Sequence, residues 1–295
     1  MQRLTRKQLV LLIALTIFWG LNWPLMKIAV ADYPPLTFRA LSLWLSVPVM
    51  VLVLRVTRTP LSLPRERWRD MFWLAFFNMM VWHALIILAV KLLSGGRAAV
   101  LGYSMPVFSA LFGAWIWGDR LTHRAGGGVV AAALGIALLL WHEISGLTGH
   151  PLGVLLALGG AAAFGLGTQM LRRSAMPVSV LTITFWMLLL ASISMSLLAL
   201  LFERDQWSVP MPTVTLAAVI YSGLIIFSFA HTVWFFLART LPPVASTLSV
   251  MMIPVIGVFS GALFIGEVLH WQDYAAVLLL MVSMASVLWP VRPAR

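Results

Sequence analysis

The chain has 295 residues, of which 61% are hydrophobic and only 10% are charged, whereas a soluble domain of ordinary composition carries about a quarter charged residues. It contains no cysteine, which excludes disulfides, cysteine-based metal sites and thiol chemistry. The formal net charge is +11, but the basic residues fall in short segments between long apolar runs. That distribution is typical of membrane topology and contact with anionic lipids, not of nucleic-acid binding.

Repeated apolar runs of about 20 residues match the thickness of the hydrocarbon core of a bilayer, so the sequence predicts an all-α integral membrane protein. The expected spans are residues 8–30, 36–55, 69–90, 97–118, 125–142, 151–171, 178–202, 213–238, 243–266 and 272–290. The first run is too long, and too polar at its end, for a cleaved signal peptide, so it counts among the ten spans. The connecting segments are short, and no soluble domain is expected.

The distribution of basic residues predicts how the spans are oriented. With the N-terminus in the cytoplasm, most of the 20 lysine and arginine residues fall on the cytoplasmic side. Only Lys27, Lys91, Arg97 and Arg204 fall on the opposite side, and Arg39 lies inside a span. Because cytoplasmic loops carry the excess of basic residues, both termini are expected in the cytoplasm.

The first two spans carry the first candidate site residues. Trp19, Asn22, Trp23 and Met26 recur at helical spacing and share one face. An asparagine is unfavourable in lipid, so this face should turn inward, where Asn22 could orient a cargo while the tryptophans stack on it. An interhelical hydrogen bond with core packing is the alternative. Arg39 is expected to snorkel to the membrane interface, with a clamp for a substrate carboxylate as the alternative.

The third span contains His83, and the fourth contains Tyr103 and Pro106. A histidine inside the membrane is a candidate proton carrier or hydrogen-bond donor, and the alternative is a neutral histidine bonded to a neighbouring carbonyl. Tyr103 is a candidate for the cavity wall. Pro106 lacks a backbone donor and is expected to kink or break its helix.

The eighth span has the most polar face in the chain, formed by Tyr221, Ser228, His231 and Thr232. In the ninth span, Ser249 is a further candidate for the cavity wall, and Pro254 is expected to disturb the helix as Pro106 does. His83 and His231 have no acid or further histidine near them in sequence, so no metal or cofactor is expected.

Segment 83–121 recurs without a gap as segment 231–269. The residues identical in both copies are His83/His231, Leu93/Leu241, Pro106/Pro254, Val107/Val255, Gly113/Gly261, Ala114/Ala262, Gly118/Gly266 and Leu121/Leu269. Two further pairs, Lys91/Arg239 and Asp119/Glu267, keep their charge. A histidine, a basic residue, a proline, a glycine and an acid in one register indicate an internal repeat, with copies over residues 1–145 and 146–295.

Each copy contains five expected spans, and because five is odd the second copy enters the membrane upside down relative to the first. Inverted repeats are typical of alternating-access transporters, which hold their substrate near the membrane midplane between the halves. Pro106 and Pro254, at corresponding positions of the two halves, are therefore the expected hinges. A channel built from an inverted repeat is the alternative.

The acidic residues restrict the charge of the cargo. All nine lie in loops or at the ends of spans, whereas a pump for permanent cations or a carboxylate proton relay needs an acid inside the membrane. Asp119 and Glu267 are expected to order the turns that follow their helices. The cargo is therefore expected to be small, amphipathic, and neutral or zwitterionic.

Several motifs resemble those of EamA-type members of the drug/metabolite transporter superfamily. They are Phe18-Trp19-Gly20-Leu21-Asn22-Trp23, Tyr33-Pro34-Pro35-Leu36-Thr37-Phe38-Arg39, Pro106-Val107 followed by Gly118-Asp119-Arg120-Leu121, and the copy Pro254-Val255 followed by Gly266-Glu267-Val268-Leu269. The resemblance covers the whole chain and implies a ten-helix fold whose central cavity exports or exchanges small metabolites. Within this family, the chain resembles the aromatic-amino-acid and metabolite exporters. It departs from the family pattern at Asp119, where glutamate is usual, and at Ile253, where an acid is often found.

Together these features predict a secondary transporter of the inner membrane that exports or exchanges small neutral or zwitterionic metabolites, amino acids foremost. Export of nucleosides or drugs by the same fold is an alternative, and an intramembrane enzyme using His83 and His231 is an alternative of another class. The expected partners are a small-molecule substrate and membrane lipids, without nucleic acid, and the chain is expected to be a monomer or a weak homodimer.

Overall fold

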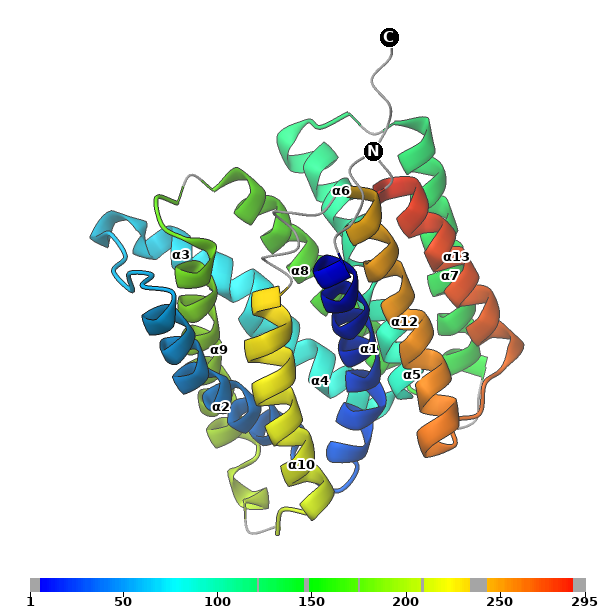
Figure 1. Cartoon of the computed structure of the whole chain (residues 1–295). Coiled ribbons are helices and arrows are strands. Elements are labelled where there is room, and N and C mark those ends of the chain that lie inside the picture. Colours follow the sequence, from blue (N-terminus) through cyan, green and yellow to red (C-terminus); the bar gives the residue numbers. More distant parts are fainter. Residues whose placement is uncertain are drawn as a thin grey trace.

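The long apolar runs form helices, which satisfy the backbone groups of each segment internally. The structure is a computed structural model that describes residues 6–120, 122–145, 149–174, 176–207, 210–233 and 243–288, and every regular element in these ranges is helical (Figure 1). Within the described residues, eight helical segments are long and apolar enough to cross a membrane.

The helices of residues 1–145 follow the expected spans, with two interruptions. The elements are α1 (Arg6–Ala29), α2 (Pro35–Val56), η1 (Arg65–Arg67), α3 (Trp68–Ala75), η2 (Phe76–Val81), α4 (Trp82–Leu92), α5 (Gly95–Gly102), α6 (Met105–Trp117) and α7 (His123–Ser145). The third expected span is one continuous helical segment, but its middle, η2, is a π-helix. The fourth is broken at Tyr103 and Ser104, and Pro106 lies in the first turn of the new helix α6.

The helices of residues 146–295 also follow the expected spans. The elements are α8 (Pro151–Arg173), α9 (Val180–Phe202), η3 (Arg204–Gln206), α10 (Thr213–Tyr221), η4 (Ser222–Ala230), α12 (Pro243–Ile265) and α13 (Trp271–Leu288). The segment η4 is a second π-helix, in the span that corresponds to the one containing η2. The ninth expected span differs from the fourth, because α12 continues through Pro254 without a break.

Helices from the two sequence halves pack mainly against each other. The largest pairings are α7 with α13, α1 with α12, α2 with α9, and α4 with α8, and Figure 1 shows α7 beside α13 and α2 beside α9. Each pairing joins a helix of residues 1–145 to one of residues 146–295. The two halves are therefore interleaved through the bundle.

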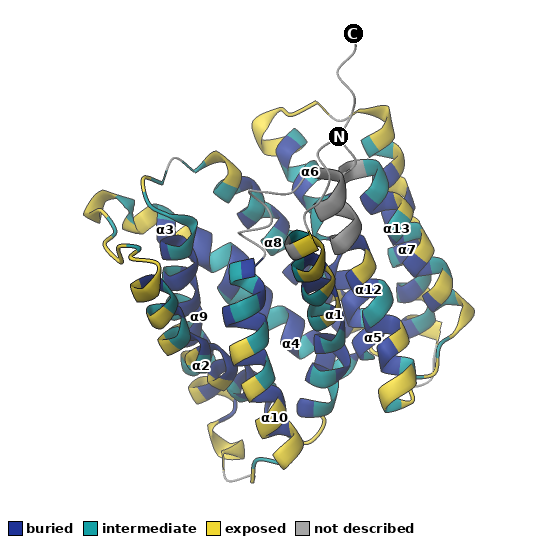
Figure 2. Ribbon diagram, viewed as in Figure 1, coloured by how far each residue is buried: buried dark blue, intermediate teal, exposed yellow. Residues whose placement is uncertain are grey.

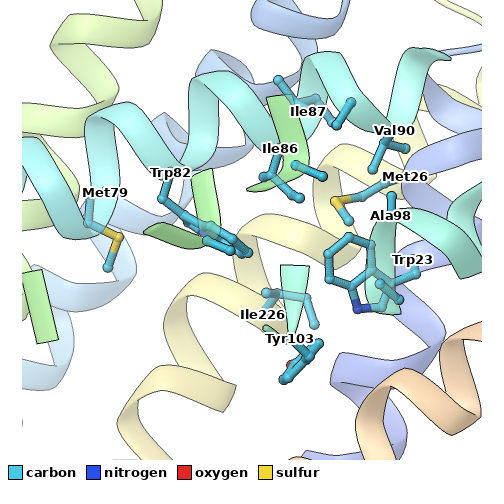
Figure 3. Close-up of a cluster of buried hydrophobic side chains, with 14 of the residues drawn as sticks. Trp23, Met26, Met79, Trp82, Ile86, Ile87, Val90, Ala98, Tyr103 and Ile226 are labelled. Carbon is cyan, nitrogen blue, oxygen red and sulfur yellow. The ribbon is translucent and has the colours of Figure 1, made fainter. Parts of the chain in front are cut away.

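Buried residues lie between the helices, and exposed apolar residues cover the outside (Figure 2). Trp115, Leu201 and Leu263 are among the large apolar side chains that face outward. An outer surface of this kind is unfavourable in water and suits contact with lipid tails. The core itself is rich in aromatic, methionine and aliphatic side chains, several of which Figure 3 shows around Trp23 and Trp82.

Polar contacts tie the helices together at the end of the bundle where α1 finishes, called here the Lys27 end. Lys27 Nζ donates to the carbonyls of Val90 and Lys91 at 3.1 Å, and Lys91 Nζ donates to those of Val30 and Ala31 at 2.5 and 2.7 Å. Each lysine thus binds carbonyl groups that a helix end leaves without a partner. This exchange fixes the ends of α1 and α4 to each other.

Two carboxylates at the same end bind the first backbone N–H groups of helices from the other half. Glu203 accepts from the Leu36 and Thr37 amides at the start of α2, at 2.8 and 2.7 Å. Glu267 accepts from the Gly95 and Gly96 amides at the start of α5, at 2.5 and 3.1 Å. A helix N-terminus has free N–H groups and a partial positive charge, so each carboxylate is stabilised where it lies.

Arg97, in the first turn of α5, joins three helices at the Lys27 end. Its guanidinium contacts Glu143 at the end of α7 at 2.5 Å and Asp273 at the start of α13 at 2.7 Å. Both carboxylates are buried. The short helix α5 is therefore held by Glu267 through its backbone and by Glu143 and Asp273 through its side chain.

Replacing Arg97 with methionine should destabilise the protein, because Glu143 and Asp273 would lose their shared cation. Removing one partner of a buried ion pair lowers the free energy of unfolding by about 3–5 kcal/mol. Thermal unfolding in detergent measures the effect. The control is Arg204→Met, because Arg204 and Asp205 form an exposed pair at 3.7 Å, and such pairs contribute about 1 kcal/mol or less. Equal melting temperatures of the two variants would contradict this role of Arg97.

Candidate functional site

Each of the two intramembrane histidines follows a π-helix. The segment η2 ends two residues before His83, and η4 ends immediately before His231. Within η4, Ser228 Oγ donates to the Gly223 carbonyl at 2.8 Å, five residues back along the chain. His231 Nδ1 lies 2.8 Å from the Ile226 carbonyl, again five residues back. π-Helices are rare and are frequent at functional sites, so their occurrence before both histidines of the repeat marks this region.

The ring of Phe227 lies at the centre of a cluster of candidate residues. His83 contacts it edge-on with the ring centroids 5.1 Å apart, and His231 lies 5.9 Å away. Trp19 contacts His231 edge-on at 5.8 Å. The fold thus brings together Trp19 from α1, His83 from α4 and His231 after η4, around Phe227 of η4.

Arg39 of α2 belongs to the same cluster. Its Cζ atom lies 5.5 Å from the centre of the Phe227 ring and 5.8 Å from that of Phe38. Arg39 Nη2 donates to the Met26 sulfur at 2.8 Å, and Arg39 Nε has no hydrogen-bond partner. Only 2% of Arg39 is exposed. The expectation that Arg39 snorkels to the membrane interface is therefore wrong: the side chain turns inward onto the aromatic rings.

His83 is buried with both ring nitrogens lacking a hydrogen-bond partner. It packs on the same Phe227 ring as Arg39 and His231. The two histidines therefore differ. Because a carbonyl only accepts, His231 Nδ1 carries a proton and donates to Ile226, whereas His83 has its hydrogen-bonding capacity unused.

A second group of candidates lies beside this cluster. Trp23 of α1 and Tyr103, at the break between α5 and α6, meet at a ring distance of 6.1 Å (Figure 3). Asn22 Oδ1 accepts a long hydrogen bond of 3.4 Å from Ser222. Tyr221 donates to the Phe18 carbonyl at 2.7 Å. The face of α1 that the sequence predicts to point inward thus contacts residues of both halves.

The remaining candidates either hydrogen-bond within their own helical segment or have side chains outside the described residues. Ser228 and Thr232 donate to carbonyls one helical turn or slightly more back along the chain, and Thr232 also approaches the Met50 sulfur at 3.8 Å. Ser249 lies in α12, and its side chain is outside the described residues. The roles of Pro106 and Pro254 as hinges stay predictions.

Sequence reasoning missed Phe227 and the inward position of Arg39. Phe227 is one apolar residue among many in its span, but it lies one turn before His231, and that spacing was an available signal. The burial of Arg39 depends on α2 packing against η4, which no local pattern reveals.

Among the described residues, no group of three or more potential metal ligands converges. All nine acidic residues lie in the described ranges, and none forms a salt bridge with a group in the Phe227 cluster. An enzyme using His83 and His231 would need a nucleophile, acid or metal ligand converging with them.

Several proteins with similar sequences are named as transporters. The model of the EamA-like transporter family matches residues 6–141 and again residues 151–289. An uncharacterized transporter of Bacillus subtilis, YoaV, is 23% identical over 87% of this chain and 88% of its own length. A protein of Escherichia coli named a probable amino-acid metabolite efflux pump is 23% identical over 95% of this chain and 94% of its own. These names describe transporters and not enzymes.

A solved crystal structure has the same fold. It covers 95% of this chain and 96% of its own chain with a TM-score of 0.66, at 21% sequence identity.

Replacing Phe227 with leucine should lower the free energy of unfolding by about 2 kcal/mol, because the variant loses ring contacts with His83, His231 and Arg39 as well as buried area. Thermal unfolding in detergent measures the loss. Phe202→Leu is the control, since Phe202 is 71% exposed on the outer surface. A Phe227→Leu variant as stable as the control would show that the ring does not hold the cluster together.

Proposed function

Because this chain belongs to the EamA-like transporter family, we propose that it is a secondary transporter that exports or exchanges small neutral or zwitterionic metabolites, amino acids foremost. It is a multi-pass protein of the inner membrane. The observation that carries the proposal is the meeting at Phe227 of the two histidines that follow the π-helices, one histidine from each half of the chain.

We propose alternating access as the mechanism. The two π-helices and the two histidines occur at corresponding positions of the repeat, which supports ten spans arranged as two inverted five-span copies, with both termini in the cytoplasm. The Phe227 cluster contains residues of both halves, which supports a site between them. The break at Tyr103 and Ser104 supports a hinge at Pro106.

The cargo class follows from the side chains near the cluster. Trp19, Trp23 and Phe227 offer aromatic surface for an apolar cargo group, and Asn22 offers an amide for a polar one. No acid lies there to attract a permanent cation. A nucleoside or drug with the same mixture of aromatic and polar groups is the second candidate, favoured only by the aromatic surface.

Counterflow in proteoliposomes loaded with a panel of amino acids tests the proposal. Labelled neutral amino acids should accumulate without a pH gradient. Accumulation only when a proton gradient is imposed would assign coupling to His83 and His231. Absence of exchange for amino acids, nucleosides and drugs alike would reject the transport function.

Trp19→Ala and His231→Ala should each reduce counterflow to the level of empty liposomes. Each substitution removes one partner of the ring contact between Trp19 and His231. Membrane insertion and the amount of purified protein should be unchanged. Trp115→Ala is the matched control, because Trp115 faces outward and its loss should leave flux intact. Normal flux in Trp19→Ala would remove that residue from the site.

The chain has no cysteine, so an introduced cysteine is a unique reporter of topology. Arg120→Cys should react with a membrane-impermeant thiol reagent only after the membrane is opened, since the positive-inside distribution places this loop in the cytoplasm. Asp205→Cys should react in intact cells, because residue 205 is exposed and the proposed topology puts its loop on the opposite side. The reverse labelling pattern would invert the proposed orientation.

A further inference from the structure

Arg39 is a buried cation without a counter-charge. Its one hydrogen-bond acceptor is the Met26 sulfur, and its nearest rings are those of Phe38 and Phe227. A desolvated charge is unfavourable unless it is paired and hydrogen-bonded. A sulfur atom and two ring faces replace only part of what water supplies, so the described structure leaves the guanidinium incompletely satisfied.

The chain itself has no acid to offer Arg39. The acids that bind cations or backbone N–H groups elsewhere are Asp70, Asp119, Glu143, Glu203, Asp205, Glu267 and Asp273. The other two, Asp32 and Glu66, lie in the turn after α1 and in η1, and neither pairs with Arg39. All nine acids of the chain lie within the described ranges.

His83 adds a second unsatisfied group to the same place. It is 6% exposed, both of its ring nitrogens lack partners, and it shares the Phe227 ring with Arg39. A neutral imidazole provides one donor and one acceptor. Unsatisfied buried groups are rare in folded proteins, and each calls for an explanation such as a missing ligand.

We propose that Arg39 and His83 form a subsite for the carboxylate of the cargo. This rests on the proposed transport function and narrows it: the transported molecule carries a carboxylate beside an apolar group. A guanidinium offers a planar fork of donors that matches the two oxygens of a carboxylate. The donor nitrogen of His83 reaches toward the same anion, and its other nitrogen accepts from an ammonium group, so an α-amino acid satisfies both groups.

The aromatic surroundings complete the match. Phe227 contacts both members of the polar pair, and Trp19 contacts His231, which packs on the same Phe227 ring. An apolar side chain attached to the carboxylate-bearing carbon therefore has rings to pack against. A nucleoside or an organic cation leaves Arg39 without its counter-charge. Such molecules should therefore be poor cargoes.

The test uses full-length protein in proteoliposomes and in detergent. The probes are L-phenylalanine, L-phenylalaninol, which lacks the carboxylate, and 3-phenylpropionate, which lacks the amine. L-Phenylalanine should exchange, 3-phenylpropionate should compete with it, and L-phenylalaninol should do neither. Binding of L-phenylalanine or of 3-phenylpropionate should also raise the melting temperature of the wild-type protein.

Arg39→Met should lower L-phenylalanine counterflow at least about 100-fold, because the substitution removes a pair of charge-assisted hydrogen bonds to the carboxylate. Its melting temperature without ligand should equal or exceed that of the wild type, because an unpaired buried charge is replaced by an apolar side chain of similar length. Arg39→Lys keeps the charge without the fork and should retain an intermediate rate. The control is Arg55→Gln, an exposed arginine of the same helix, with wild-type flux.

Three outcomes would overturn the subsite. They are equal exchange of L-phenylalanine and L-phenylalaninol, wild-type exchange by Arg39→Met, and a lowered melting temperature of Arg39→Met with its flux per folded molecule unchanged, which would make Arg39 structural. In each of these cases transport itself stands. Absence of exchange and of thermal stabilisation with every probe and with the wider panel would reject the transport function, and the subsite with it.

Discussion

The absence of water from the bilayer core governs this structure, because every polar group within it must find a partner in the protein. The helices meet that demand for the backbone. At the Lys27 end, Lys27 donates to carbonyls at the end of α4 and Lys91 donates to carbonyls just after α1. Glu203 and Glu267 accept from the first N–H groups of α2 and α5. Against this background, Arg39 Nε and both ring nitrogens of His83 stand out, because they are buried without a partner beside Phe227. The other such atoms among the described residues are Gln272 Oε1 and Ser283 Oγ of α13.

The sequence predicted the helices well, because an apolar run of fixed length is a local property. It also selected Trp19, His83 and His231 as candidates, since a polar or aromatic face at helical spacing within a span is visible in one dimension, and the structure brings these three into one cluster. It missed the position of Arg39, because the direction of a long side chain is set by the neighbour of its helix, here η4. The π-helices were invisible for a related reason: one extra residue per turn leaves no mark in an apolar run.

The two copies of the repeat are alike in local geometry and different in partners. Gly118 and Gly266 both adopt positive φ, 71° and 68°, at the end of a helix. The backbone N–H of the next residue, Asp119 or Glu267, donates to the carbonyl of Gly113 or Gly261. Glu267 then binds the start of α5, whereas Asp119 contacts Arg173 at 2.5 Å. The residues at the positions equivalent to Gly95 and Gly96 are Pro243 and Val244, and a proline has no N–H to offer. The longer glutamate of the second copy therefore meets a glycine pair in the first copy, whereas the shorter aspartate of the first copy corresponds to a proline and a valine in the second.

The first turn of the short helix α5 is held by ion pairs and hydrogen bonds, whereas its last turn ends at a break in the helix. Glu267, Glu143 and Asp273 hold its first turn, while its last residues lead into the break before α6. Mechanically, α5 is a lever of about 12 Å, given its eight residues and a rise of about 1.5 Å each. Its pivot is the first turn, and the tip carries Tyr103 against Trp23. A small rotation about the first turn would therefore displace the Tyr103 ring sideways, while the ion pairs of that turn would stay almost stationary.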